Sequence, residues 1–173
     1  LMQNDQPRLA AEAYSGVPEG DDLRAGAQMQ RAEALQAMGS ESAAINALQT
    51  LAAARPDLAL VQAALGDALR RAERHEEAIA AYDRMLSLVD PDEPRYWFIY
   101  YARAISHHQS DDWPPAEADF RRALELNPGQ PNVLNYLGYS LVEQRRDFDE
   151  ALNMIEQAVA ARPGSGYIVD SLG

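Results

Sequence analysis

The sequence predicts an all-α protein, in which antiparallel helix pairs stack into a right-handed superhelix. A spacing recurs four times: a small residue, a second small residue twelve positions later, and an aromatic or leucine residue four positions after that. A proline usually follows eight positions further on, as in the set Ala104, Ala116, Phe120 and Pro128. A fixed period in the thirties indicates stacked helix pairs instead of one closed core. Composition agrees, because 47% of the residues are hydrophobic, mostly alanine and leucine, and only 8% are aromatic.

The period also predicts where the repeats begin and end. Successive starts lie 34, 38, 34 and 35 residues apart, so two intervals contain insertions. Four complete copies are expected, at residues 25–58, 59–96, 97–130 and 131–165. Residues 1–18 are expected to be the second helix of a preceding repeat, and residues 166–173 the start of a further one. The chain therefore reads as a piece of a longer array.

Each repeat is expected to contain two helices joined by a turn. The first helices should begin near Ala25, Ala59, Trp97 and Pro131. Proline should end the second helices, because its ring removes a backbone donor and clashes with the preceding turn. The longer insertion, residues 90–95, has two prolines and three acids that prevent helix continuation. The shorter one falls within residues 144–149, and the register resumes at Ala151.

These residues resemble the tetratricopeptide repeat. The eighth position is Gly66 or Gly138 in two copies, and the twentieth is always alanine: Ala44, Ala78, Ala116 and Ala151. Small residues there let paired helices cross closely, so Gly138 is expected at a helix crossing. The resemblance covers nearly the whole chain and implies a non-catalytic scaffold for binding other proteins. Residues 135–141 and 166–173 are also similar to a subset of proteobacterial repeat proteins, some of them envelope lipoprotein adaptors.

Charge and residue usage limit the function classes. A net charge of −12 argues against a general nucleic-acid or anionic-membrane binder, because neutralising phosphates needs clustered cations. All 15 basic residues are arginine, which we interpret as a bacterial coding bias. The absence of cysteine excludes disulfides and thiolate metal sites. No apolar stretch is long enough to span a membrane, and both a cytoplasmic and an envelope location stay open.

Helical geometry predicts which residues face a ligand. At 100° per residue, the second, sixth, ninth and thirteenth positions of a first helix point away from its partner helix, and the fifth and twelfth lie beside that stripe. In a superhelix these positions line the concave groove. The candidate groove residues are Phe98, Tyr101, His108, Asn132, Asn135, Tyr136, Tyr139, Asp67 and Arg70. Alternatively, some of the aromatic side chains pack against the neighbouring repeat.

Several other patterns could indicate chemistry. His107 and His108 precede two aspartates at a spacing that can bring metal ligands together, but His107 is better explained as a hydrogen-bonded core residue. No catalytic residue, metal or cofactor is expected. Relatives that clamp a terminal carboxylate use a lysine at the fifth position, which this chain lacks, although Arg70 and Arg71 could pair with an acidic ligand. Arg103 takes a position that is leucine in sister repeats, so we expect a partly buried ion pair with Glu117, Asp119 or Asp67.

The leading functional hypothesis is a non-catalytic protein–protein interaction scaffold that holds a peptide segment of a partner in its groove. One alternative is a targeting or regulatory arm of a larger enzyme. Another is a structural array that associates with itself. The identity of the partner does not follow from these residues.

Overall fold

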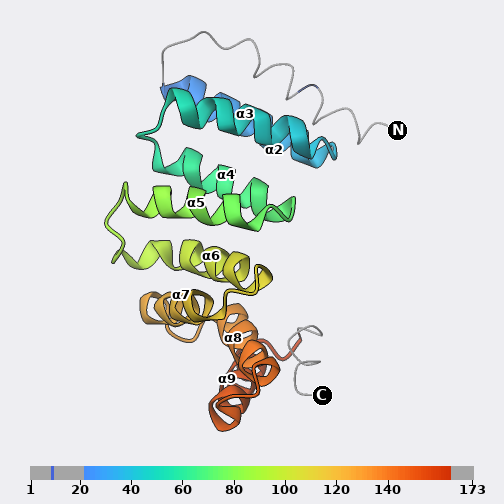
Figure 1. Ribbon diagram of the computed structural model, residues 1–173, viewed down its shortest axis with the longest axis vertical. Coiled ribbons are helices and arrows are strands. Elements are labelled where there is room, and N and C mark those ends of the chain that lie inside the picture. The colour runs from blue at the N-terminus through green and yellow to red at the C-terminus, as the bar shows by residue number, and fades with distance from the viewer. Residues whose placement is uncertain (1–8, 10–21, 165–173) are drawn as a thin grey trace. The chain divides into compact units, whose positions relative to one another are not determined.

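The computed structural model describes Leu9 and residues 22–164, and within that part the fold is all-α (Figure 1). Eight α-helices and one short 3-10 helix, η2 (Pro94–Tyr96), form the described part. The α-helices are α2 (Asp22–Ala37), α3 (Glu41–Ala54), α4 (Ala59–Arg71), α5 (His75–Leu86), α6 (Trp97–Gln109), α7 (Trp113–Leu126), α8 (Pro131–Glu143) and α9 (Phe148–Ala161). Apart from Leu9, the partial repeats expected at residues 1–18 and 166–173 lie outside the described residues.

The chain forms two compact units, Leu1–Pro91 and Asp92–Gly173, and the boundary falls within the insertion at residues 90–95. In the first unit α2 pairs with α3 and α4 with α5, and α3 packs on α4. In the second unit α6 pairs with α7 and α8 with α9, and α7 packs on α8. Short turns join the helices of each pair and make them antiparallel (Figure 1). The expected all-α fold of antiparallel pairs is confirmed.

Small residues let the paired helices approach closely. The twentieth-position alanines, Ala44, Ala78, Ala116 and Ala151, are all fully buried. A Cβ added at Gly138 would lie 2.9 Å from the carbonyl oxygen of Ala151 and from Cγ1 of Ile155. A Cβ added at Gly66 would lie 2.6 Å from the ring of Tyr82. Both glycines therefore stand at helix crossings, as expected for Gly138.

A buried ion pair crosses the seam between α6 and α7. Arg103 donates from Nε and Nη2 to the two carboxylate oxygens of Asp119, each over 2.7 Å. Their side chains are only 18% and 9% exposed. The guanidinium also lies 5.5 Å from the ring centroid of Tyr100, within cation–π range. The expected Arg103 ion pair is confirmed, with Asp119 as its partner.

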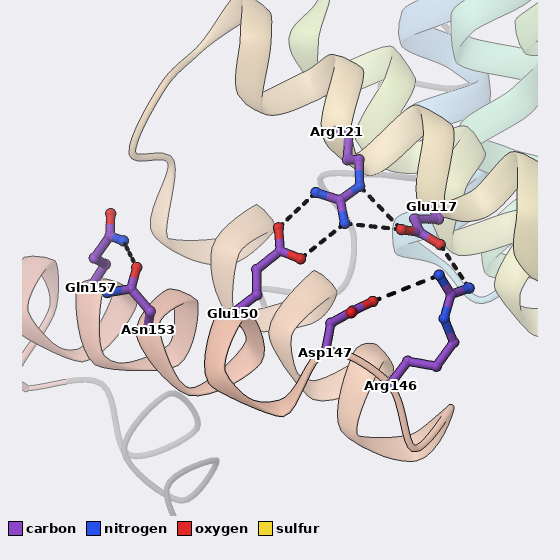
Figure 2. A network of polar contacts seen from close by, with 7 residues as sticks. All are labelled: Glu117, Arg121, Arg146, Asp147, Glu150, Asn153 and Gln157. Atoms are coloured by element: carbon purple, nitrogen blue, oxygen red, sulfur yellow. Dashed lines mark hydrogen bonds and ion pairs between the residues drawn. The ribbon is translucent and has the colours of Figure 1, made fainter.

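A network of charged side chains ties α9 and the preceding turn to α7 (Figure 2). Arg121 of α7 donates to Glu117 on its own helix and, over 2.7 Å, to Glu150 of α9. The hydrogen bond from Arg121 lowers the pKa of Glu150 below its usual value of 4.5. Arg146 lies 3.5 Å from Glu117 and 3.6 Å from Asp147. Asp147 has a φ of 49°, which is costly for a residue with a side chain, so the network supports a strained turn.

Candidate functional site

Aromatic side chains gather on α6, on α8 and at the start of α7 in the second unit. We define the aromatic surface by the ring contacts that join its members and by one exposed neighbour. Six members are linked by ring contacts: Trp97, Phe98, Tyr101, His108, Trp113 and Tyr136. The seventh, Tyr139, follows Tyr136 by three residues, so it lies one turn further along the same side of α8.

Tyr136 joins the two helix pairs of this unit. Its ring lies 6.2 Å from Tyr101 and 5.7 Å from His108, both on α6 and both in edge-on geometry. It also lies 5.1 Å from the ring of Phe120, a fully buried residue of α7. The hydroxyl accepts a hydrogen bond from Nε2 of Gln109 over 3.3 Å. Tyr136 is therefore half-buried and held in place by packing, which agrees with the alternative that some groove aromatics cover the neighbouring repeat.

Two members of the aromatic surface are open to solvent. Phe98 is 43% exposed and Tyr139 is 50% exposed. Covering a large exposed apolar side chain with a partner is favourable, because it removes apolar surface from water. Fixing an aromatic ring in a complex costs little conformational entropy, because the side chain has few rotatable bonds. His108 adds a polar group, with Nε2 at 3.6 Å from a carboxylate oxygen of Glu143. The surface thus combines a rigid aromatic base with two exposed rings.

The two candidate asparagines of α8 differ in exposure. Asn132 is half-buried, and its Oδ1 accepts a hydrogen bond of 3.4 Å from Arg162. Asn135 is only 1% exposed, so the expectation that it faces a ligand in the groove is wrong for this structure. It is the fifth residue of α8, a position beside the outward-facing stripe, and packing there removes it from solvent. Its Oδ1 has no hydrogen-bond partner among the described residues.

The candidate residues of α4 are already engaged with their neighbours. Asp67 accepts a hydrogen bond of 2.8 Å from the hydroxyl of Tyr82, and Nη2 of Arg70 lies 3.8 Å from the same carboxylate. Arg71 donates to the side-chain oxygen of Gln36 over 2.6 Å. Arg70 thus lies near a carboxylate of its own helix, whereas the printed hydrogen bond of Arg71 goes to a neutral amide.

A hollow of about 560 Å³ opens beside Asp67 in the first unit. We call it the acidic hollow. Residues of α2, α4 and the first turn of α3 line it: Glu33, Gln36, Ala37, Glu41, Ala64, Asp67, Ala68 and Arg71. It carries three carboxylates and one guanidinium. Asp67 is the one residue of the candidate groove set that lines it, and Arg70 reaches it only through Asp67.

The histidines of α6 do not assemble a metal site in the described part of the chain, where no three histidine, cysteine or acidic residues come together. His107 is largely buried, and its Nδ1 lies 3.5 Å from a carboxylate oxygen of Asp112. That nitrogen has no hydrogen-bond partner among residues 22–164, so the expectation of a hydrogen-bonded core histidine is wrong for Nδ1. The turn places Asp112 beside His107 without the alignment that a hydrogen bond requires.

Sequence reasoning missed Trp97, Trp113 and Glu41 as members of these two surfaces. Trp97 and Trp113 are the first residues of α6 and α7, and Glu41 is the first residue of α3. The candidate set comes from the inner positions of first helices, so it omits residues at helix starts. Trp113 follows His108 by five residues across a turn, so their ring contact can be predicted only once the conformation of that turn is known.

The fold and the sequence both match known repeat proteins. Two models of the tetratricopeptide repeat match residues 57–129 and 101–166, which together span most of the described chain. A "TPR repeat-containing protein" of Pseudomonas aeruginosa is 27% identical over 99% of this chain. This chain spans only 28% of that relative's length, and 35% of the length of another curated relative.

Solved structures of repeat proteins show the same fold. PilF of Pseudomonas aeruginosa has a TM-score of 0.80 at 21% identity, over 99% of this chain and 74% of that one. YrrB, described as a TPR protein with an unusual peptide-binding site, has a TM-score of 0.76 at 16% identity, over 99% of this chain and 86% of that one. At such identities the likeness concerns the fold alone. None of the described helices has the length and apolar character needed to cross a membrane.

Proposed function

Because this chain belongs to the tetratricopeptide repeat family, we propose that it is a non-catalytic module whose aromatic surface holds a peptide segment of a partner protein. Domains of this family are generally protein-interaction modules and typically lack catalysis. YrrB supports the proposal of peptide binding, since that protein has the same fold and is described as having a peptide-binding site.

The observation that carries the proposal is the contrast within the aromatic surface. Tyr101, Tyr136 and His108 brace one another, while Phe98 and Tyr139 keep about half of their surface in water. Side chains that are already held by their neighbours lose little conformational entropy when a ligand binds. The exposed rings provide apolar area that the ligand can cover. The half-buried Asn132 adds an amide that can bond a peptide backbone.

The proposal can be tested in two steps. Crosslinking and pulldown of the full-length protein from its own cells would identify partners, and peptides from those partners would then be titrated by fluorescence polarisation. We expect Phe98→Ala and Tyr139→Ala each to weaken binding about tenfold or more, because truncated aromatic anchors often cost about 2 kcal/mol. Phe148→Ala is the matched control, since Phe148 is 56% exposed on α9 and is not among the residues that define the aromatic surface.

Unchanged affinity in both folded surface variants would overturn the proposal. Equal weakening by the Phe148→Ala control would also overturn it, because the effect would then not belong to this surface.

Self-association is a second candidate, favoured by one observation. Val142, Phe148 and Leu152 are exposed apolar residues near the joined ends of α8 and α9. Sedimentation of the wild type and Phe148→Ala at several concentrations tests it. A mass that rises with concentration only in the wild type would support an array, and a constant monomer mass would reject one. A targeting arm of a larger enzyme stays an alternative that the domain content of the complete gene decides.

A further inference from the structure

The lining of the acidic hollow combines apolar and charged side chains. Ala37, Ala64 and Ala68 contribute only methyl groups to it. Glu33, Glu41 and Asp67 supply three carboxylates from three different helices. The volume of about 560 Å³ falls in the range of roughly 300–1,000 Å³ that is usual for ligand pockets. A long side chain with an apolar stem and a charged tip matches this arrangement.

Charge in the hollow is not balanced by the described part of the chain. Glu33 and Glu41 are exposed and form neither a hydrogen bond nor an ion pair with any described residue. Arg71, the guanidinium of the lining, is held by Gln36 over 2.6 Å. Arg70 approaches Asp67 only to 3.8 Å and does not line the hollow. The lining therefore presents excess negative charge to whatever enters.

A buried tyrosine holds one of these carboxylates in place. Tyr82 is fully buried, and its hydroxyl donates to Oδ1 of Asp67 over 2.8 Å. Burial and the nearby Asp67 charge raise the pKa of Tyr82, so the hydroxyl keeps the proton that it donates. Gly66 provides the space for the ring, because a Cβ there would lie 2.6 Å from it. Asp67 is thus oriented from the core of the α4–α5 pair.

From this geometry we infer that the acidic hollow receives a basic side chain, arginine or lysine, of the partner segment. Charge complementarity selects this occupant: the apolar stem contacts the methyl groups of the lining, and the cation pairs with Glu33, Glu41 and Asp67. The inference rests on the proposed function as a protein-binding module, but its site is separate from the aromatic surface. Exposed ion pairs are screened by salt, so binding here should weaken as ionic strength rises.

The inference can be tested by nuclear magnetic resonance on the full ¹⁵N-labelled chain. The probes are N-acetyl-arginine N-methylamide and its lysine counterpart, each with a single charge, and the uncharged citrulline analogue. We expect both cationic probes to shift the backbone amides of Ala37, Ala64 and Ala68, with at least fivefold lower affinity at high salt. The citrulline probe should leave these amides unchanged.

Variants locate the effect. Glu33→Gln combined with Glu41→Gln should lower the affinity for the arginine probe at least fivefold. The charge-matched control is Glu76→Gln combined with Glu156→Gln, which alters exposed glutamates outside the hollow and should have no effect. Tyr82→Phe, which keeps the ring but frees Asp67, should lower the affinity at least twofold, and the spectrum reports whether the fold persists.

Two results would overturn the inference: equal shifts from the citrulline probe, or shifts spread over acidic residues throughout the chain. Failure here is distinguishable from failure of the proposed function. The arginine probe reports on amides of α2 and α4, whereas Phe98→Ala and Tyr139→Ala report on partner peptides at the aromatic surface.

Discussion

Asp67 and Tyr139 occupy the same place in their helices but present different chemistry. Each is the ninth residue of its helix, α4 in the first unit and α8 in the second. Asp67 lines the acidic hollow, whereas Tyr139 is a half-exposed ring of the aromatic surface. The position is outward-facing in both, so the close helix crossings do not restrict it to small residues. Residues at outward positions can therefore differ between repeats while the scaffold stays the same.

The seams between paired helices show the opposite behaviour, with one exception. Leu65 of α4 and Ala81 of α5 are both buried, as a seam requires. Arg103 of α6 and Asp119 of α7 take the corresponding places in the second unit and form the buried ion pair. The second unit thus has a charged pair at seam positions where the first unit has apolar side chains. A charge pair is tolerated there because each partner is satisfied by the other.

Breaking this ion pair should have the largest effect on stability. Asp119→Ala leaves the Arg103 guanidinium partly buried without its carboxylate, so we expect a loss of about 3 kcal/mol in the free energy of unfolding. The double variant Arg103→Leu with Asp119→Ala rebuilds the seam of the first unit and should recover most of that loss. Urea unfolding of wild type, single and double variants measures both. A double variant as unstable as the single one would contradict this account.

Overpacking a helix crossing should have the next largest effect. Gly138→Leu forces a side chain against the carbonyl oxygen of Ala151, which cannot move without shifting α9, so we expect a cost of about 2–3 kcal/mol. Tyr139→Ala, one residue away, removes a half-exposed ring and should change stability much less. Thermal melting of both variants tests the register, and equal shifts in Tm would refute it.

The buried asparagine of α8 should respond in the opposite direction. Asn135→Leu is close in size and removes an acceptor that has no partner among the described residues, so we expect a gain of up to about 1 kcal/mol. Chemical unfolding measures it, with Asn132→Leu as the control, because Asn132 has a hydrogen-bond partner to lose. A clear loss of stability in Asn135→Leu would show that its amide is satisfied in solution.

The smallest expected effect is the acid dependence of the Arg121–Glu150 pair. The pKa of Glu150 is lower in the folded state than its usual value of 4.5, so the ionised pair stabilises the fold at neutral pH. This stabilisation is lost as the pH falls from 4.5 through the lowered folded-state pKa. Glu150→Gln should therefore lower Tm slightly at pH 7, by the equivalent of less than about 1 kcal/mol because the pair is partly exposed. At a pH below the lowered pKa, wild type and variant should melt together. A difference that persists in acid would assign the effect to another interaction.

Regular spacing made the helix pairs predictable. Ala78 and Gly66 could be recognised from residue type and position alone, because close crossings admit only small residues and the same requirement recurs in each repeat. The Arg103 pair could be anticipated because a charge at a leucine position must find a partner. In these cases the physical demand is local to one helix pair and is expressed in residue type.

The candidate sites depended on information that no repeat pattern contains. Helical angle alone places Asn135 beside the outward-facing stripe, yet it is buried, because neighbouring elements can cover a side chain at the edge of that stripe. Trp113 and Glu41 joined their surfaces from helix starts, where the turn sets the direction of the chain. Asp67 could be placed facing outward from sequence, but its hydrogen bond to the buried Tyr82 arises only when α4 and α5 are packed. Periodicity thus determined which residues lie at close helix crossings. Tertiary packing determined which outward-facing residues come into contact, because those contacts depend on turn conformations and side-chain rotamers that the repeat pattern does not specify.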